Sequence, residues 1–109
     1  MKNRTSLQEA ASWIVAQTRG NNDCSDDKCI HICCDLIEAH YSIPTAKGGA
    51  HQRLLSVTRY VDQMSALGRA VIWGLWAIRC GPEDDVWDAI TQAEILDSSS
   101  GAMARTEEP

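Results

Sequence analysis

The chain has 109 residues, the length of one ordinary domain, and its 44% apolar and 23% charged residues exclude wholesale disorder. The formal net charge of −5 argues against direct binding of nucleic acid or of an anionic membrane. The longest apolar run, Ala70 to Ile78, has nine residues and falls far short of the roughly 20 that span a bilayer.

The first helix is predicted over residues 7–19. Ser6 and Glu9 fit a capping box, in which each side chain accepts a backbone N–H of the other residue. A stripe at helical spacing follows, formed by Leu7, Ala11, Ile14, Val15 and Thr18. Gly20 then suits the left-handed residue that ends many helices.

A second helix is predicted from Ser25 or Asp26 to Tyr41 or Ser42. Acidic residues in its first turn complement the helix dipole, and Pro44 disfavours helix at the residue before it. Its buried stripe is expected to contain Ile30, Cys33, Cys34, Ile37 and Tyr41.

After a flexible connection over residues 44–49, a third helix is predicted from about residue 51. No strong breaker appears before Gly81, so the pattern allows one helix of nearly thirty residues or two helices. A single helix of that length is about 45 Å long, which is awkward in so small a domain. We therefore expect a break at Gly68.

The segment Ala70–Ile78 is apolar on every side, which predicts a central helix surrounded by the others. The last helix is predicted to open at Pro82, and its inner stripe consists of Val86, Ile90, Ala93 and Leu96. The predicted fold class is all-α, a compact bundle of about five helices with a flexible C-terminal tail. Residues 1–97 form the single helical domain and residues 98–109 a disordered acidic tail.

The cysteines are the first candidate for chemistry. Cys29 and Cys33 lie one helical turn apart and could share a metal ion with Cys24, but the paired spacing of a structural zinc site is missing. Free cysteine is also among the most frequently buried residue types. The sequence therefore favours core cysteines, and Cys24, Cys29 and Cys33 are the residues that a metal site would use.

A thiol nucleophile is the alternative use of Cys24 or Cys29, since both lie near a predicted helix start. The neighbouring aspartates disfavour a thiolate, and a catalytic cysteine needs a nearby histidine base, which only the fold could provide through His51. With no export signal and five cysteines, we expect reduced thiols in the cytoplasm.

Charge is distributed unevenly along the chain. Residues 23–41 carry −4 and residues 80–109 carry −7, whereas residues 44–79 carry +4. The layout suits internal pairing or an acidic face for a basic partner. The last helix is the most acidic segment, and its predicted partner-binding residues are Glu83, Asp84, Asp85 and Asp88. Dipole matching explains two or three of these acids but not Glu94 and Asp97 as well.

Small residues also bear on assembly. Ala66, Ala70 and Gly74 fall on one i+4 ridge, which is more often an internal groove than a dimer seam. Trp73 and Trp76 are expected in the core first, and an exposed one becomes a candidate anchor for a partner.

No catalytic pair, triad or cofactor loop is recognisable, so the sequence favours a binding protein over an enzyme and predicts no cofactor. The leading hypothesis is a small acidic inhibitor that occupies a basic protein, for example a nucleic-acid-binding one. A phage-encoded, anti-CRISPR-like blocker of a defence complex would fit this description, as would an immunity protein for a toxin. A cysteine-based zinc or thiol module and a structural homodimer are the alternatives.

Overall fold

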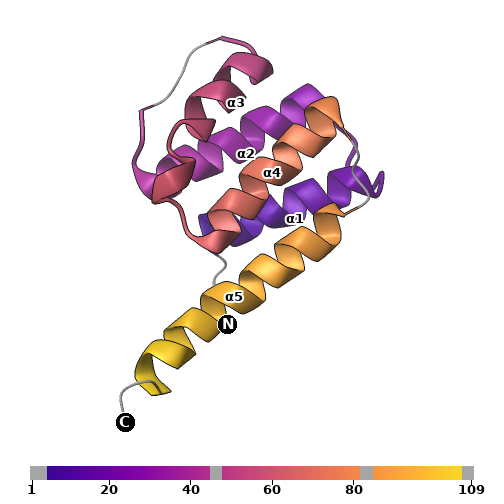
Figure 1. The fold of residues 1–109 in the computed structure, drawn as a ribbon. Helices are drawn as coiled ribbons and strands as arrows, with labels where there is room; N and C mark the ends of the chain where they lie inside the picture. The colour runs from indigo at the N-terminus through magenta and orange to yellow at the C-terminus, as the bar shows by residue number, and fades with distance from the viewer. Residues whose placement is uncertain (1–4, 45–47, 82–84, 107–109) are drawn as a thin grey trace.

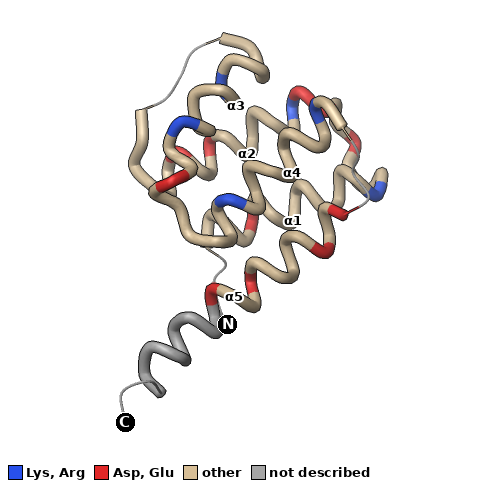
Figure 2. Tube along the Cα trace, in the orientation of Figure 1, with Lys and Arg blue, Asp and Glu red and all other residues tan. Residues whose placement is uncertain are grey.

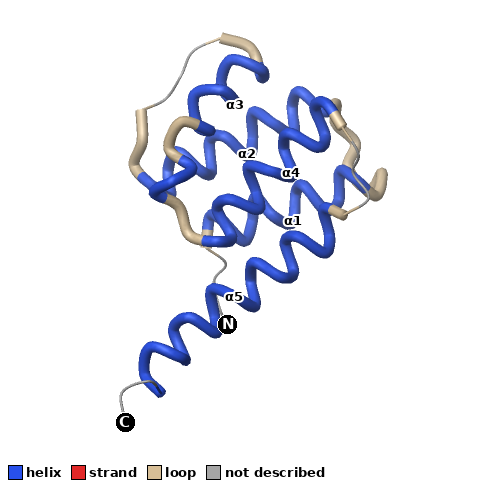
Figure 3. The backbone as a smooth tube through the Cα atoms, in the orientation of Figure 1, coloured by secondary structure: helices blue, strands red, loops and turns tan. Residues whose placement is uncertain are grey.

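The computed structural model describes residues 5–44, 48–81 and 85–106, with side chains described through residue 97. All secondary structure in these ranges is helical (Figure 3), which confirms the all-α prediction. The elements are α1 (Ser6–Thr18), α2 (Asp26–Tyr41), α3 (Ala50–Thr58), the 3₁₀ helix η1 (Val61–Gln63), α4 (Ala66–Cys80) and α5 (Val86–Thr106).

Helix α4 is the central element of the bundle. It contacts α1, α2, α3, α5 and η1 (Figure 1), and Val71 and Leu75 on its inner side are fully buried. The predicted central helix is therefore confirmed. Trp73 is an exception, because 43% of its surface is exposed on the outer side of α4.

The small-residue ridge of α4 is used inside the chain. A Cβ atom at Gly74 would lie 2.9 Å from Ile14 Cγ2 and 3.4 Å from Val86 Cγ1. Glycine at this position therefore lets α1 and α5 approach α4 closely. The ridge packs within one molecule, as its composition favoured, and does not form an open seam.

The predicted start of the first helix is wrong by one residue. Thr5, not Ser6, is the N-cap, because its backbone is extended and its Oγ1 accepts the Gln8 N–H at 3.1 Å. Gln8 Oε1 accepts the Thr5 N–H at 3.0 Å and completes the capping box in place of Glu9. Gly20 has the left-handed φ of 75° that its position predicts.

The second helix lies where it was predicted. Ser25 is its N-cap and accepts the Lys28 N–H, and Ser42 ends it with a left-handed φ of 57°. The stripe residues Ile30, Cys33, Cys34 and Ile37 are fully buried, and Tyr41 is partly buried.

The predicted break at Gly68 is wrong. The chain leaves helical structure after Thr58 and resumes it at Ala66, so Gly68 lies in the first turn of α4. Ser65 caps α4 and accepts the Gly68 N–H at 3.3 Å. Asp97 of α5 accepts the two N–H groups before it, from Ala66 at 3.1 Å and from Leu67 at 3.0 Å. A local cap and a distant carboxylate therefore set the start of α4.

Helix α5 buries Val86, Ile90 and Ala93 as predicted, but Leu96 is 56% exposed, so its place in the inner stripe is wrong. The next residue on that stripe is Asp97, and Leu96 lies 100° of helix rotation away from it. The helix also continues through Ser98 to Thr106, past its expected end. The predicted opening at Pro82 and residues 45–47 of the connection lie outside the described residues, and the disorder of residues 98–109 stays a prediction.

An ionic cluster lies buried between α2 and α3. Arg53 donates to Glu38 Oε1 at 3.0 Å and to Asp35, and its guanidinium also lies 3.2 Å from His31 Nδ1. Arg53 and Glu38 are both buried, whereas Asp35 is exposed. Although burial opposes the charged form of Arg53, its bonds to the two carboxylates raise its pKa.

No described helix is both long and apolar enough to cross a membrane. The molecule is elongated, with extents of 49 × 31 × 30 Å, because α5 extends beyond the other helices (Figure 1).

Candidate functional site

The starts of the two acidic segments lie at one end of the bundle, where several acidic positions gather (Figure 2). The α1–α2 loop and the start of α5 both lie there, and two contacts join them to neighbouring helices. Asp27 pairs with Arg79 at the end of α4, with 3.7 Å between the charged atoms. The Arg19 guanidinium at the end of α1 lies 4.6 Å from the Trp87 ring centroid. We define the acidic end as Asp23, Asp26, Asp27, Asp85 and Asp88.

The α1–α2 loop is held in place by hydrogen bonds. Gln17 Nε2 donates to the Cys24 carbonyl at 3.1 Å and to Asp26 Oδ1 at 2.9 Å. Asn22 Nδ2 donates to the Trp13 carbonyl at 3.0 Å. These bonds join the loop and Asp26, the first residue of α2, to α1.

Two aspartates and a tryptophan are exposed at the start of α5. Asp85 and Asp88 are exposed, and Trp87, one residue before Asp88, is 49% exposed despite its contact with Arg19. Of the predicted patch, Asp85 and Asp88 thus lie on the surface, whereas Glu83 and Asp84 lie outside the described residues. Cations lie close in sequence to these acids or to their contacts: Arg19 at the end of α1, Lys28 in the first turn of α2 and Arg79 in the last turn of α4.

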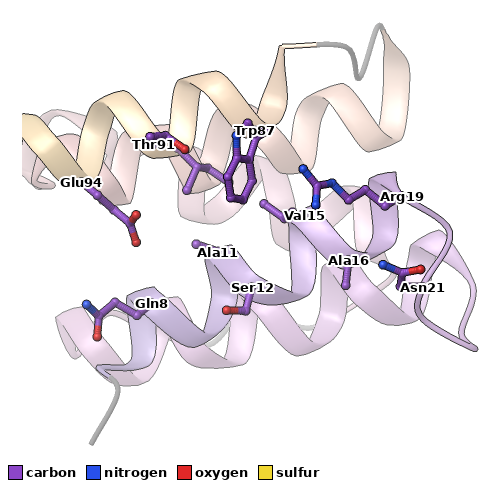
Figure 4. Close-up of a pocket in the computed structure, with 11 residues that line it drawn as sticks. Gln8, Ala11, Ser12, Val15, Ala16, Arg19, Asn21, Trp87, Thr91 and Glu94 are labelled. Atoms are coloured by element: carbon purple, nitrogen blue, oxygen red, sulfur yellow. The ribbon is translucent and has the colours of Figure 1, made fainter. Parts of the chain in front are cut away.

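A groove of about 350 Å³ runs from this end between α1 and α5. Ala11, Val15 and Ile90 are among the apolar residues that line it, and Trp87 stands at its wall beside Arg19 (Figure 4). Gln8 and Glu94 lie at the opposite end of the groove (Figure 4). The groove therefore offers an apolar lining between charged ends, which suits an amphipathic segment of a partner.

The two remaining acids of α5 have different roles. Glu94 lines the groove, but Asp97 receives the N–H groups of Ala66 and Leu67 at the start of α4. Asp97 is thus explained by the fold, and Glu94 remains available to a partner.

The cysteines are mostly core residues, as their type predicts. Cys29, Cys33 and Cys34 are fully buried, Cys24 is half-buried and Cys80 is exposed. A hydrogen bond from the Cys33 thiol lowers the pKa of Cys29, and that bond together with burial raises the pKa of Cys33. Burial raises the pKa of Cys34 to about 12.

The described histidines nearest the candidate thiols in the sequence analysis contact other groups. His51, the base that a thiol nucleophile would need, instead packs edge-on against Trp76 and lies 3.4 Å from Arg79 Nε. His31 lies against Arg53. Within the ranges that the structure describes, no group of three or more His, Cys, Asp or Glu side chains could hold a metal ion. Cys24, Cys29 and Cys33 therefore do not converge as a ligand set.

Trp87, Arg19 and the groove were not predicted from the sequence as parts of a site. A signal was present, since Trp87 lies between two aspartates and 100° of helix rotation from the buried Val86, which predicts exposure. The pairing of Trp87 with Arg19 and the space between α1 and α5 depend on how the two helices cross, which local spacing does not encode.

No family model, curated protein or solved structure matches the chain. The function of the protein is therefore inferred from the positions of its own side chains.

Proposed function

We propose that the protein is a binding module that docks its acidic end and the adjoining groove on a basic surface of another protein. One observation supports the proposal: exposed aspartates from opposite halves of the sequence lie at one end of the bundle, where Trp87 is half-exposed.

The physical roles of these groups are complementary. Exposed carboxylates attract a basic partner over a distance and speed its encounter. Tryptophan is among the residues most often responsible for the strength of an interface, because its large apolar surface is lost from water on binding. Trp87 is adjacent to the groove, so it would anchor a segment whose apolar side chains enter the space above Val15 and Ile90.

The partner class follows from the charge. A basic nucleic-acid-binding protein presents the lysines and arginines that the acidic end would neutralise, and occupying them would block nucleic acid. The protein would then act as an inhibitor, such as a phage-encoded blocker of a defence complex or an immunity protein, in the cytoplasm. No catalytic step and no cofactor is part of the proposal.

The test is affinity capture from source-cell lysate followed by titration of the identified partner. The Asp85→Lys/Asp88→Lys variant should weaken binding at least about tenfold, equivalent to roughly 1.4 kcal/mol. A variant carrying Asp62→Lys, Gln52→Lys and Gln63→Lys raises the net charge by the same amount at exposed positions of α3 and η1. Equal loss in both variants, or loss in neither, would contradict the proposal.

Trp87→Ala gives a second readout that does not depend on charge. It should weaken binding of the same partner by about tenfold or more, as truncation of a central interface tryptophan does. Leu96→Ala, at an exposed apolar residue of α5 outside the groove and the acidic end, is the matched control and should bind like the wild type.

A further inference from the structure

A second surface, of opposite character, lies on α3 and α4. Trp76 is the point where the two helices meet: its Nε1 donates to Thr58 Oγ1 at 2.9 Å, and its ring contacts His51 edge-on at 5.5 Å between centroids. Large apolar side chains are exposed on either side of this contact. Leu55 on α3 is 44% exposed, and Trp73 on α4 is 43% exposed.

Helical spacing places an arginine next to each of these apolar residues. Arg59 follows Leu55 by one turn on α3, and Arg69 precedes Trp73 by one turn on α4. Both arginines are exposed, and Arg69 is oriented by its bond to the Val61 carbonyl at 3.4 Å. We define the basic aromatic face as Leu55, Trp73, Trp76, Arg59 and Arg69.

The charges around this face are few. Asp62 on η1 is the exposed acid nearest in sequence, and Arg79 further along α4 is already paired with Asp27. Two arginines around an apolar centre are too few for a phosphate backbone, where each contacted phosphate needs its own cation. The face suits a partner that brings both carboxylates and an apolar side chain.

We propose that the occupant of the basic aromatic face is the acidic end of a second copy of this chain. The acidic end supplies the exposed carboxylates of Asp85 and Asp88 and, 100° of helix rotation from Asp88, the half-exposed Trp87, which together complement the two arginines and the apolar centre. Helix α3 and the start of α4 lie at one side of the bundle and the start of α5 at the other (Figure 1). In an antiparallel pair with twofold symmetry, in which both surfaces of each copy face the other copy, the contact would form twice.

This dimer contact rests on the same acidic end as the proposed function, so a basic partner and a second copy of the chain would compete for that end. A partner that binds Asp85, Asp88 and Trp87 would have to displace the second copy. The two ideas are nevertheless tested by different measurements, because self-association needs no partner.

The experiment is sedimentation equilibrium of the pure protein up to about 100 µM, a range that detects micromolar association. The weight-average mass of the wild type should rise from 12.0 kDa toward twice that value, and added salt should reverse the rise. Two charge-reversed variants, Arg59→Glu/Arg69→Glu and Asp85→Lys/Asp88→Lys, should each remain monomeric.

The mixture of these two variants provides the decisive readout. Each variant repels itself, but the reversed face of one attracts the reversed end of the other, so the equimolar mixture should regain the dimer mass. Circular dichroism checks that each variant is folded. If Arg69→Glu disturbs the fold, Arg59→Glu combined with Trp73→Ser replaces it as the face variant and should be monomeric alone.

Three results would overturn the inference: a monomeric wild type throughout the range, self-association of both variants, or a mixture that stays monomeric. A monomeric wild type that binds a single-stranded oligonucleotide through Arg59 and Arg69 would assign the face to nucleic acid instead. A monomer that still captures a basic partner would leave the proposed function intact. A dimer that captures none would contradict the proposed function alone.

Discussion

The two arginines that tie α2 to its neighbours form the same kind of ion pair in opposite surroundings. Arg53 is buried with Glu38 between α2 and α3, whereas Arg79 meets Asp27 at 3.7 Å on the surface, where the two side chains are 39% and 65% exposed. Water solvates the second pair whether or not it forms, so its net contribution is small. The first pair cannot lose one partner without leaving a charge in the interior. Whether an ion pair is buried or exposed therefore determines how much of the protein's stability depends on that pair.

The largest expected effect is at the buried pair. Arg53→Ala removes the cation that neutralises Glu38, whose Oε2 already lacks a hydrogen-bond partner among the described residues. The free energy of unfolding should fall by about 3–5 kcal/mol in urea denaturation. The double variant Arg53→Met/Glu38→Leu removes both charges and should recover most of that loss. If the free energy of unfolding of Arg53→Ala fell by less than about 1 kcal/mol, the loss would be on the order of that of a surface pair. The buried and the exposed ion pair would then not differ in their contribution to stability.

An intermediate effect is expected at Asp97, a partly buried carboxylate that meets backbone N–H groups in place of an arginine. Asp97→Ala leaves the N–H groups of Ala66 and Leu67 without their acceptor and should cost about 1 kcal/mol, like the loss of a helix cap. The measurement is the denaturation midpoint at constant slope. Glu94→Ala, three residues earlier on the exposed side of α5, is the control and should change the midpoint little.

The smallest effect is expected at the surface pair. Asp27→Asn should change the free energy of unfolding by less than about 0.5 kcal/mol, and raising the salt concentration should abolish even that difference. A loss above 2 kcal/mol would show that the Asp27–Arg79 contact is as well shielded as the buried pair.

Much of the fold followed from local patterns, because apolar periodicity and capping residues act within a few residues of sequence. The α2 stripe and its Ser25 cap were predicted correctly for that reason. The start of α4 was not, since its second acceptor, Asp97, comes from α5. Leu96 was wrongly assigned to the inner stripe of α5 because it is apolar, whereas helical spacing places the polar residue Asp97 on that stripe.

The buried pair was missed although the sequence contained a signal for it. Arg53 falls within the apolar spacing of Ala50, Leu54 and Val57, and Glu38 follows the buried Cys34 by one turn. Opposite charges embedded in two apolar stripes indicate a buried ion pair. At the candidate site, Asp85 and Asp88 were predicted from the sequence as partner-binding residues, whereas Asp23, Asp26 and Asp27 were not, because the proximity of the α1–α2 loop to the start of α5 depends on tertiary structure.

The placement of the tryptophans makes the molecule its own optical reporter. Trp76 is hydrogen-bonded where α3 meets α4, whereas Trp73 and Trp87 are half-exposed on the two proposed surfaces. Indole emission shifts to shorter wavelength when the ring leaves water. Single Trp→Phe variants would therefore assign a spectral change on association to one surface or the other, without any added label.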